Sequence, residues 1–144
     1  MNRLCFCVLA ALFTTCVSLG EEQPKAVKDE LKLLEGEWKV VKAESGGKAV
    51  KSKSVVVYTA DGKSSISDPN SGLPPLKTTI ALDPTKKPKW IDVTNARGRT
   101  DKGIYELNGD QMKAVFRAGG DRPTEFKTEA EGEVMYTYER VKPK

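Results

Sequence analysis

The sequence predicts an all-β protein: one eight-stranded antiparallel up-and-down barrel with a short N-terminal helix. Eight segments alternate between apolar and polar residues or are rich in β-branched residues, which is typical of strands. Gly, Pro, Asn and Asp separate these segments, and no interval is long enough for a crossover helix. Consecutive strands should therefore pair antiparallel. Closing them into a barrel removes both sheet edges, and a β-sandwich is the alternative architecture.

Residues 1–20 have the layout of a secretory signal peptide. Arg3 gives a positive start, Leu4–Phe13 is an uncharged apolar run, and Ser18 and Gly20 are small residues suited to cleavage after Gly20. A retained membrane anchor is the alternative, but this run is about half of the roughly 20 apolar residues that a spanning helix needs. We therefore expect an exported protein, periplasmic, envelope-associated or extracellular, with no membrane span in the mature chain.

The composition excludes several kinds of reactive site. The 144-residue chain contains no His, which excludes His-based nucleophilic catalysis and His-ligated zinc or haem. Cys5, Cys7 and Cys16 all lie in the predicted leader, so a mature chain would have no thiol for a disulfide, catalysis or a metal. Cys16 also lies where a bacterial lipoprotein carries its acylated cysteine, which is a second processing route. We expect no cofactor, no metal and no catalytic residue.

A linker and a helix precede the barrel. Residues 21–25 are polar and indicate a linker, so we expect the folded domain to occupy residues 26–144. A helix is predicted over 26–35, because apolar residues recur at i, i+4 and i+7, and Gly36 follows in the place of a C-cap glycine. The three apolar positions are Val27, Leu31 and Leu34.

Eight strands are predicted after the helix. Asp61-Gly62 and Asn108-Gly109 are the strongest hairpin signals between them, since both dipeptides accept the positive φ of a type I′ turn. An eight-stranded barrel has an interior that side chains can fill or that can hold one small ligand. The strand segments are Trp38–Ala43, Val55–Ala60, Lys63–Asp68, Lys77–Leu82, Lys89–Thr94, Gly103–Leu107, Gln111–Arg117 and Glu133–Arg140.

The start of the first strand resembles the Gly-x-Trp signature of lipocalin-type barrels. Gly36-Glu37-Trp38 follows the predicted helix, and Arg140 stands at the end of the last strand. In that superfamily the Trp closes one barrel end and an Arg packs across it. The resemblance implies that Trp38 lies within van der Waals reach of Arg140, and a guanidinium over an indole contributes ~1–2 kcal/mol when partly desolvated.

Four segments resemble a family of small secreted domains of unknown function that is expanded in planctomycete bacteria. They span nearly all of the predicted mature chain in order. The resemblance implies a lipocalin-like β-barrel in an envelope or extracellular setting, and it brings no established activity, substrate or catalytic residue. The segments are Leu34–Val41, Asp83–Val93, Lys102–Asp110 and Arg122–Phe126.

Aromatic residues are the candidates for a ligand site. Alternation places Tyr136 and Tyr138 on one face of their strand, as it does Met112, Ala114 and Phe116 on theirs. Such side chains suit a small apolar ligand, but they equally fill a small barrel, and we expect the filled interior. The candidate residues are Tyr58, Trp90, Tyr105, Phe116, Tyr136 and Tyr138.

Charged residues offer weaker candidates. Arg122 could grip an anionic ligand with Glu125 as acid or base, but a loop-ordering ion pair with Phe126 as a hydrophobic plug is the favoured interpretation. Several Asp residues near strand ends could form a glycosidase-like pair or a calcium site, although Asp in such places is ordinary turn chemistry. They are Asp61, Asp68, Asp92, Asp101, Asp110 and Asp121.

Three functions follow from these observations, in order of preference. The first is a non-enzymatic envelope or extracellular interaction or structural module. The second is a binding protein for a small apolar ligand, which requires a cavity of roughly 300 Å³ or more. The third is a carboxylate-based hydrolase. The partner is unknown, a small apolar ligand or an envelope component, and the net charge of +4 is too mild to indicate nucleic acid.

Overall fold

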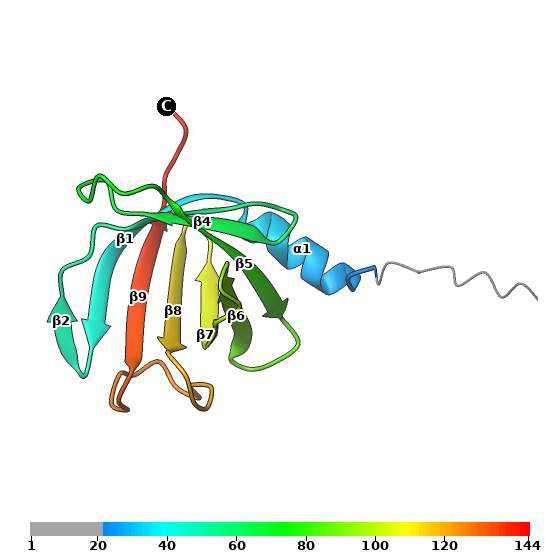
Figure 1. The fold of residues 1–144 in the computed structure, drawn as a ribbon. Coiled ribbons are helices and arrows are strands. Elements are labelled where there is room, and N and C mark those ends of the chain that lie inside the picture. Colours follow the sequence, from blue (N-terminus) through cyan, green and yellow to red (C-terminus); the bar gives the residue numbers. More distant parts are fainter. Residues whose placement is uncertain (1–21) are drawn as a thin grey trace, which may run out of the picture.

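The computed structural model describes residues 22–144, and in it the chain forms a closed antiparallel barrel with a helix at one end (Figure 1). The predicted leader over residues 1–20 and the lipidation candidate Cys16 lie outside the described residues. Within the described range, no helix has both the length and the hydropathy needed to cross a membrane.

The described chain contains one helix and nine strands. The helix starts one residue earlier than predicted and ends one residue earlier, so the predicted linker is shortened to residues before Lys25. The elements are α1 (Lys25–Leu34), β1 (Gly36–Ser45), β2 (Lys48–Val50), β3 (Val55–Tyr58), β4 (Lys63–Ser67), β5 (Leu76–Asp83), β6 (Lys89–Asn95), β7 (Thr100–Asn108), β8 (Gln111–Arg117) and β9 (Glu133–Arg140).

The sheet topology confirms the predicted all-β barrel. From β3 to β9 each strand pairs antiparallel with the next, and β1 joins β3 on one edge and β9 on the other. These eight strands close the barrel without leaving an open edge, and β2 is an additional short strand on β1. The interior is filled at the α1 end by side chains that alternation points inward, among them Trp38, Ile91, Tyr105, Met112 and Ala114.

Strand β2 was not predicted, because all three of its side chains are exposed and it has no apolar alternation. It pairs with Ala43–Ser45 of β1, beyond the point where β3 leaves that edge. Gly46 and Gly47 connect the two strands with φ values of 56° and 71°. Positive φ at both central residues defines a type I′ hairpin turn, for which Gly-Gly is one of the suited dipeptides.

The two predicted type I′ turns are hairpins of other types. Among the described residues only glycines have positive φ, so neither Asp61 nor Asn108 adopts the conformation that a type I′ turn needs. Gly62 ends a three-residue loop with φ 80°, and its N–H bonds to the carbonyl of Thr59 at 3.1 Å. Asn108 pairs with Gln111, so Gly109 is the first central residue, as in a type II′ turn. A left-handed non-glycine residue costs energy, and both loops avoid it by placing glycine there.

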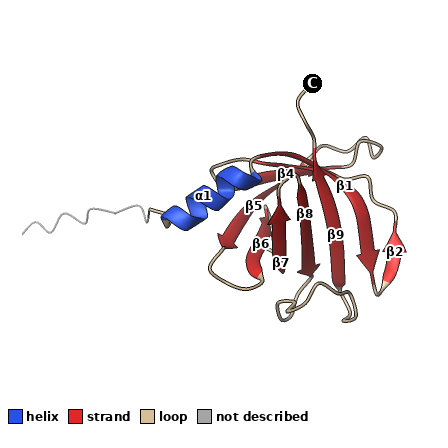
Figure 2. Cartoon of the chain, turned by 180° about the vertical axis from the view of Figure 1, so that it is seen from behind, coloured by secondary structure: helices blue, strands red, loops and turns tan. Residues whose placement is uncertain are grey.

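Helix α1 lies at one end of the barrel (Figure 2), and two side chains from the barrel hold its C-terminal end. The Arg140 guanidinium lies 4.2 Å from the Trp38 ring centroid, which confirms the predicted stacking. Arg140 donates to the carbonyls of Leu33 and Glu35, both at 2.6 Å, and the Trp38 indole donates to Leu34 at 2.8 Å. These donors satisfy carbonyls that the end of a helix leaves without partners.

Gly36 does not cap the helix as predicted. The cap residue is Glu35, and Gly36 is the first residue of β1, with φ 124°. A Cβ at Gly36 would lie 3.1 Å from the guanidinium of Arg140. Glycine is therefore required here for two reasons: the backbone conformation excludes most side chains, and Arg140 occupies the space beside it.

Candidate functional site

The barrel contains a cavity of about 210 Å³. It reaches from the middle of the barrel toward the end where the β8–β9 connection lies, away from α1. The expectation of a filled interior is therefore wrong for this half of the barrel. The lining residues are Val40, Ser54, Val56, Tyr58, Ser64, Ile66, Val93, Asp101, Phe116, Ala118, Gly132, Val134, Tyr136 and Tyr138.

Small residues leave this space open. Where the α1 end has Trp38 and Met112 inside, the opposite end has Ser54, Ala118 and Gly132. Side chains of this size do not reach the barrel axis, so the aliphatic walls formed by other strands do not meet. The cavity follows from this difference in side-chain volume between the two ends.

One wall of the cavity is aromatic. Phe116 of β8 lies next to Tyr136 of β9, with ring centroids 6.5 Å apart, and the rings of Tyr136 and Tyr138 are 5.8 Å apart. Both pairs are tilted, within the range that aromatic pairs prefer. Tyr136 and Tyr138 share a face because they are two positions apart on one strand, as the sequence predicted.

Two tyrosine hydroxyls in the cavity have no protein partner. Tyr58 is 3% exposed and Tyr138 is 4% exposed, and among the tyrosines of the described residues only Tyr105 has a hydroxyl that is hydrogen-bonded to another residue. No fully enclosed polar side-chain atom of the described residues lacks a partner, so the hydroxyls of Tyr58 and Tyr138 open onto the cavity. Burial raises the pKa of both phenols well above the ordinary value. Tyr58 and Tyr136 add to the upward shift of the Tyr138 pKa. The hydroxyls stay protonated at neutral pH and are free to pair with a guest molecule.

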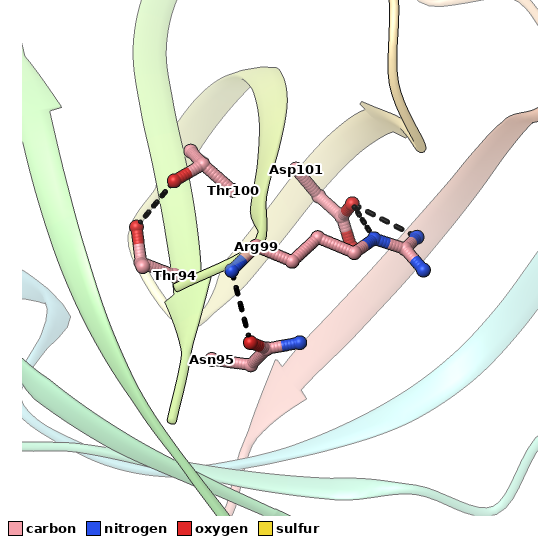
Figure 3. A network of polar contacts seen from close by, with 5 residues as sticks. All are labelled: Thr94, Asn95, Arg99, Thr100 and Asp101. Carbon is pink, nitrogen blue, oxygen red and sulfur yellow. Dashed lines mark hydrogen bonds and ion pairs between the residues drawn. The ribbon is translucent and has the colours of Figure 1, made fainter. Parts of the chain in front are cut away.

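Asp101 lines the cavity with a side chain that is 38% exposed, which places this carboxylate at the mouth, and Figure 3 shows the polar contacts that hold it. Asp101 accepts two hydrogen bonds from the Arg99 guanidinium, both at 3.1 Å. The Asn95 side chain accepts from the backbone N–H of Arg99 at 3.1 Å, which orders the β6–β7 turn, and Thr94 and Thr100 join their hydroxyls across it at 2.8 Å. Among the described residues that line the cavity, Asp101 alone carries a charge, and Arg99 balances it.

Gly103 shapes the aromatic wall, and the sequence analysis did not identify it. A Cβ at this position would lie 2.7 Å from Phe116 Cδ1 and 2.7 Å from the carbonyl oxygen of Val115. Only glycine lets the Phe116 ring lie this close to the β7 backbone. An isolated glycine inside a strand pattern is a known signal of such close approach, so the sequence did contain the information.

Two of the six aromatic candidates lie away from the cavity. Trp90 is on the outer surface of β6, 38% exposed, between the guanidinium of Arg122 at 4.3 Å and the ammonium of Lys86 at 4.9 Å. Alternation explains its place, since its neighbour Ile91 faces inward. Tyr105 does face inward, but at the α1 end, where its hydroxyl donates to buried Glu30 at 3.0 Å. The other four candidates line the cavity.

Arg122 orders a loop, and its partner is not Glu125. It forms a double hydrogen bond with the carboxylate of Asp92 and donates to the carbonyl of Gly103 at 2.7 Å. Glu125 instead contacts Lys127 at 3.1 Å on the surface. Arg122 therefore fastens the β8–β9 connection to the outer face of β6 and β7. This agrees with the predicted loop-ordering role, but the carboxylate that Arg122 binds is that of Asp92 and not that of Glu125.

A second, more open hollow of about 440 Å³ lies over β3 to β6. Its polar side chains are mostly hydroxyls, and Lys63 at its border is already paired with Asp61. Because solvent has wider access to it, a ligand there would bury less surface than in the barrel, so the barrel cavity is the better candidate. Its lining is Val57, Thr59, Lys63, Ser64, Ser65, Lys77, Thr78, Thr79, Thr94, Asn95 and Ala96.

The candidate carboxylates do not converge on the cavity. Asp92 is bound by Arg122, and Asp110, in the β7–β8 turn, contacts Arg140 at 3.3 Å at the α1 end. Within residues 22–144, no group of three or more His, Cys, Asp or Glu side chains is placed to hold a metal ion. The cavity thus presents one balanced carboxylate and no second acid beside it.

Comparison of the chain with protein-family models, with curated proteins and with solved structures gave no match. The resemblance to the planctomycete family and the predicted export therefore stay predictions, and the case for a function depends on the geometry of the cavity.

Proposed function

We propose that this protein is a non-enzymatic binding protein for a small, largely apolar molecule held inside the barrel. The observation that carries the proposal is the cavity of about 210 Å³, with aliphatic and aromatic walls and tyrosine hydroxyls that open onto it. A concave, mostly apolar space with a few polar groups is the usual form of a small-molecule site.

The size of the cavity limits the ligand. Drug-sized molecules use pockets of roughly 300–1,000 Å³, whereas an apolar cavity of about 150 Å³ holds benzene. A volume of about 210 Å³ lies between these cases and suits a single ring with a short substituent. This volume is below the roughly 300 Å³ that we expected a ligand-binding barrel to need, so the ligand proposed here is smaller than the one expected from the sequence.

The cavity also supports one of the three expected functions over the other two. The preference for an interaction or structural module rested on a filled interior, and the open half of the barrel removes that reason. A carboxylate-based hydrolase needs two acids facing a common space, and among the lining residues only Asp101 is acidic. Ligand binding is the function that the arrangement supports best.

Nuclear magnetic resonance titration with ethylbenzene and acetophenone tests the proposal. We expect saturable shifts at cavity residues such as Val56 and Phe116. Val134→Phe places a larger side chain at the partly exposed mouth and should weaken binding at least ten-fold. Val41→Phe is the matched control, because Val41 is on the outer surface and 46% exposed.

The outcomes separate clearly. Saturable binding that Val134→Phe weakens and Val41→Phe leaves unchanged supports a site inside the barrel. Absence of saturable binding of either compound to the wild-type protein would overturn the proposal. Equal effects of the two variants would place the compounds elsewhere and would also overturn it.

A further inference from the structure

We infer that the cavity selects uncharged single-ring molecules carrying a hydrogen-bond acceptor, such as an aryl ketone, over hydrocarbons and over charged analogues. The acceptor would lie between the hydroxyls of Tyr58 and Tyr138, with the ring against the aromatic wall. This inference rests on the proposed function and names the class of ligand for the same cavity.

The tyrosine hydroxyls supply the selectivity for an acceptor. Tyr58 extends from β3 and Tyr138 from β9, so the two phenols enter the cavity from the strands on either side of β1. Both residues are almost fully buried, and their hydroxyls open onto the cavity, whereas the hydroxyl of Tyr105 is already bonded to Glu30. A donor that is enclosed without a partner is costly, and a hydrocarbon guest that fills the cavity would enclose these two hydroxyls without accepting a hydrogen bond from them. A carbonyl oxygen can accept from them.

The charge of the lining excludes ions. An anion would find no Lys or Arg among the described lining residues, and it would enter past the carboxylate of Asp101. The nearest guanidinium in this network, Arg99, already directs two donors to Asp101. A cation would meet a carboxylate that Arg99 balances, and deeper in the cavity it would have no counter-charge. Burying an unpaired charge is far more costly than burying a neutral polar group.

The position of the polar groups predicts the orientation of the ligand. The walls between Tyr58 and the mouth are largely apolar, from Val56, Ile66 and Val134 together with the aromatic wall. A ketone bound with its oxygen at the tyrosines therefore places its ring toward the mouth and buries the apolar part against these side chains. The reverse orientation would leave the hydroxyls unpaired and direct the carbonyl at the negative Asp101.

Four compounds of similar size test the inference: acetophenone, ethylbenzene, benzoate and benzylammonium. On the wild-type protein we expect acetophenone to bind about 3–10-fold more tightly than ethylbenzene, the effect of one net hydrogen bond. Benzoate and benzylammonium should bind at least ten-fold more weakly than acetophenone. Nuclear Overhauser contacts should place the acetophenone methyl group near Tyr58 and Tyr138 and its ring near Val134.

Tyrosine-to-phenylalanine variants assign the effect to the hydroxyls. Tyr58→Phe and Tyr138→Phe should bring the acetophenone-to-ethylbenzene ratio close to one. Tyr105→Phe is the matched control, because its hydroxyl bonds to Glu30 outside the cavity, and it should preserve the ratio. The ratio is measured on one protein at a time, so a change in stability affects both compounds equally.

The results separate this inference from the proposed function. If neither neutral compound binds the wild-type protein, the proposed function fails, and the inference fails with it. If both bind but ethylbenzene equals acetophenone, or benzoate or benzylammonium binds as well, the inference is overturned while the cavity remains a ligand site. An unchanged ratio in both Tyr58→Phe and Tyr138→Phe, or contacts showing the reverse orientation, would also overturn the inference. The contacts use only the wild-type protein, so the test stands even where a variant fails to fold.

Discussion

Arg140 and Trp38 show how single side chains close one end of the barrel. Both stack against each other and both donate to backbone carbonyls at the end of α1. The planar guanidinium makes this possible, since its donors are arranged as a fork and its face can cover an indole. Tyr58, which pairs with Gly36, and Tyr138, which pairs with Val40, instead have hydroxyls that open onto the cavity. Residues of similar polarity thus serve packing at the end of the barrel and are available for a ligand at the inner end of the cavity.

The first prediction concerns the fork of Arg140. Arg140→Lys keeps the charge but cannot reach the carbonyls of Leu33 and Glu35 together while covering Trp38. We expect the free energy of unfolding, measured with urea, to fall by about 1–3 kcal/mol. Arg97→Lys is the control, since Arg97 is exposed and makes no side-chain hydrogen bond to a described residue, and it should change stability by less than about 0.5 kcal/mol. Equal losses in both variants would contradict the role assigned to Arg140.

The second prediction concerns Gly36. Gly36→Ala introduces a Cβ at φ 124°, next to the Arg140 guanidinium, and should lower the free energy of unfolding by about 2–4 kcal/mol. Gly72→Ala is the comparison, because Gly72 has φ 65° with no atom within 4 Å of a built Cβ, and it should cost only about 1 kcal/mol. A thermal melt of each variant measures the difference. Gly36→Ala melting at or above Gly72→Ala would argue against the crowding by Arg140.

Among the elements, the β8–β9 connection has no regular structure, yet it covers part of the outer face of the barrel and borders the mouth of the cavity. Ile104 and Val115 point outward by alternation, yet they are 1% and 0% exposed. The connection covers this outer face, fastened by Arg122 to Asp92 and by Thr128, whose hydroxyl accepts from the backbone N–H of Gly47 at 2.8 Å. Because its two ends, Ala118 and Gly132, also line the cavity, the same segment covers the outer face and borders the cavity mouth.

The third prediction is that Arg122 controls the order of this connection. Arg122→Met leaves Asp92 partly buried without its partner and should lower global stability by about 2–3 kcal/mol. Hydrogen exchange of residues 118–132 should accelerate more than that of β1 or β9. Lys127→Met removes a surface ion pair with Glu125 from the same segment and should leave exchange and stability nearly unchanged. Uniform acceleration along the chain would contradict a local fastening role.

The strands could be predicted from sequence where one face is buried, and not elsewhere. Each barrel strand places apolar residues inward, so its alternation is visible, whereas β2 exists through backbone pairing alone and has no such pattern. The turn types depend on which residue ends the ladder. Asn108 pairs with Gln111 at the end of the two strands, so it is not a central residue of the turn. The dipeptide Asn108-Gly109 alone does not reveal this shift of one position.

The cavity could be predicted only in part. Four of its aromatic residues were among the candidates, three of them placed by alternation, and Trp90 could have been excluded because Ile91 and Val93 occupy the inward positions of its strand. The open interior itself depends on how small residues from β-turns and loops, such as Ser54 and Gly132, meet across the barrel. Those contacts join distant parts of the chain, so local patterns do not contain them.

For the whole molecule, the barrel has one packed end and one open end. At the packed end α1 contributes Leu31 and Leu34 to the core, and its buried Glu30 accepts from Lys89 at 2.6 Å and from Tyr105. At the open end the interior is a cavity. A ligand at the open end can therefore bind without disturbing the packed end, which maintains the fold.

The last prediction concerns the stability of the whole barrel at high pH. All four tyrosines of the chain have raised pKa values, in each case chiefly because burial disfavours the charged phenolate. The native state therefore holds protons that the unfolded state releases near the ordinary pKa of about 10. The stabilisation is complete below that pH, and it is lost as pH rises from about 10 toward the raised native values, by up to about 1.4 kcal/mol per pH unit for each tyrosine.

Tyrosinate absorbance and circular dichroism, followed together from about pH 8 to pH 12, check this coupling. Phenolate should appear later than in a model peptide and together with the loss of β-sheet signal, because ionisation requires opening of the barrel. In Tyr58→Phe the free energy of unfolding should fall less steeply with pH, because one tyrosine that releases its proton on unfolding has been removed. Lysines also titrate in this pH range, but they do so equally in the wild type, so the difference between the two proteins reports the tyrosine alone. Phenolate absorbance that rises near pH 10 while the sheet signal is unchanged would show that solvent reaches the phenols in the folded state. Burial of the tyrosines, on which the proposed cavity chemistry also depends, would then be wrong.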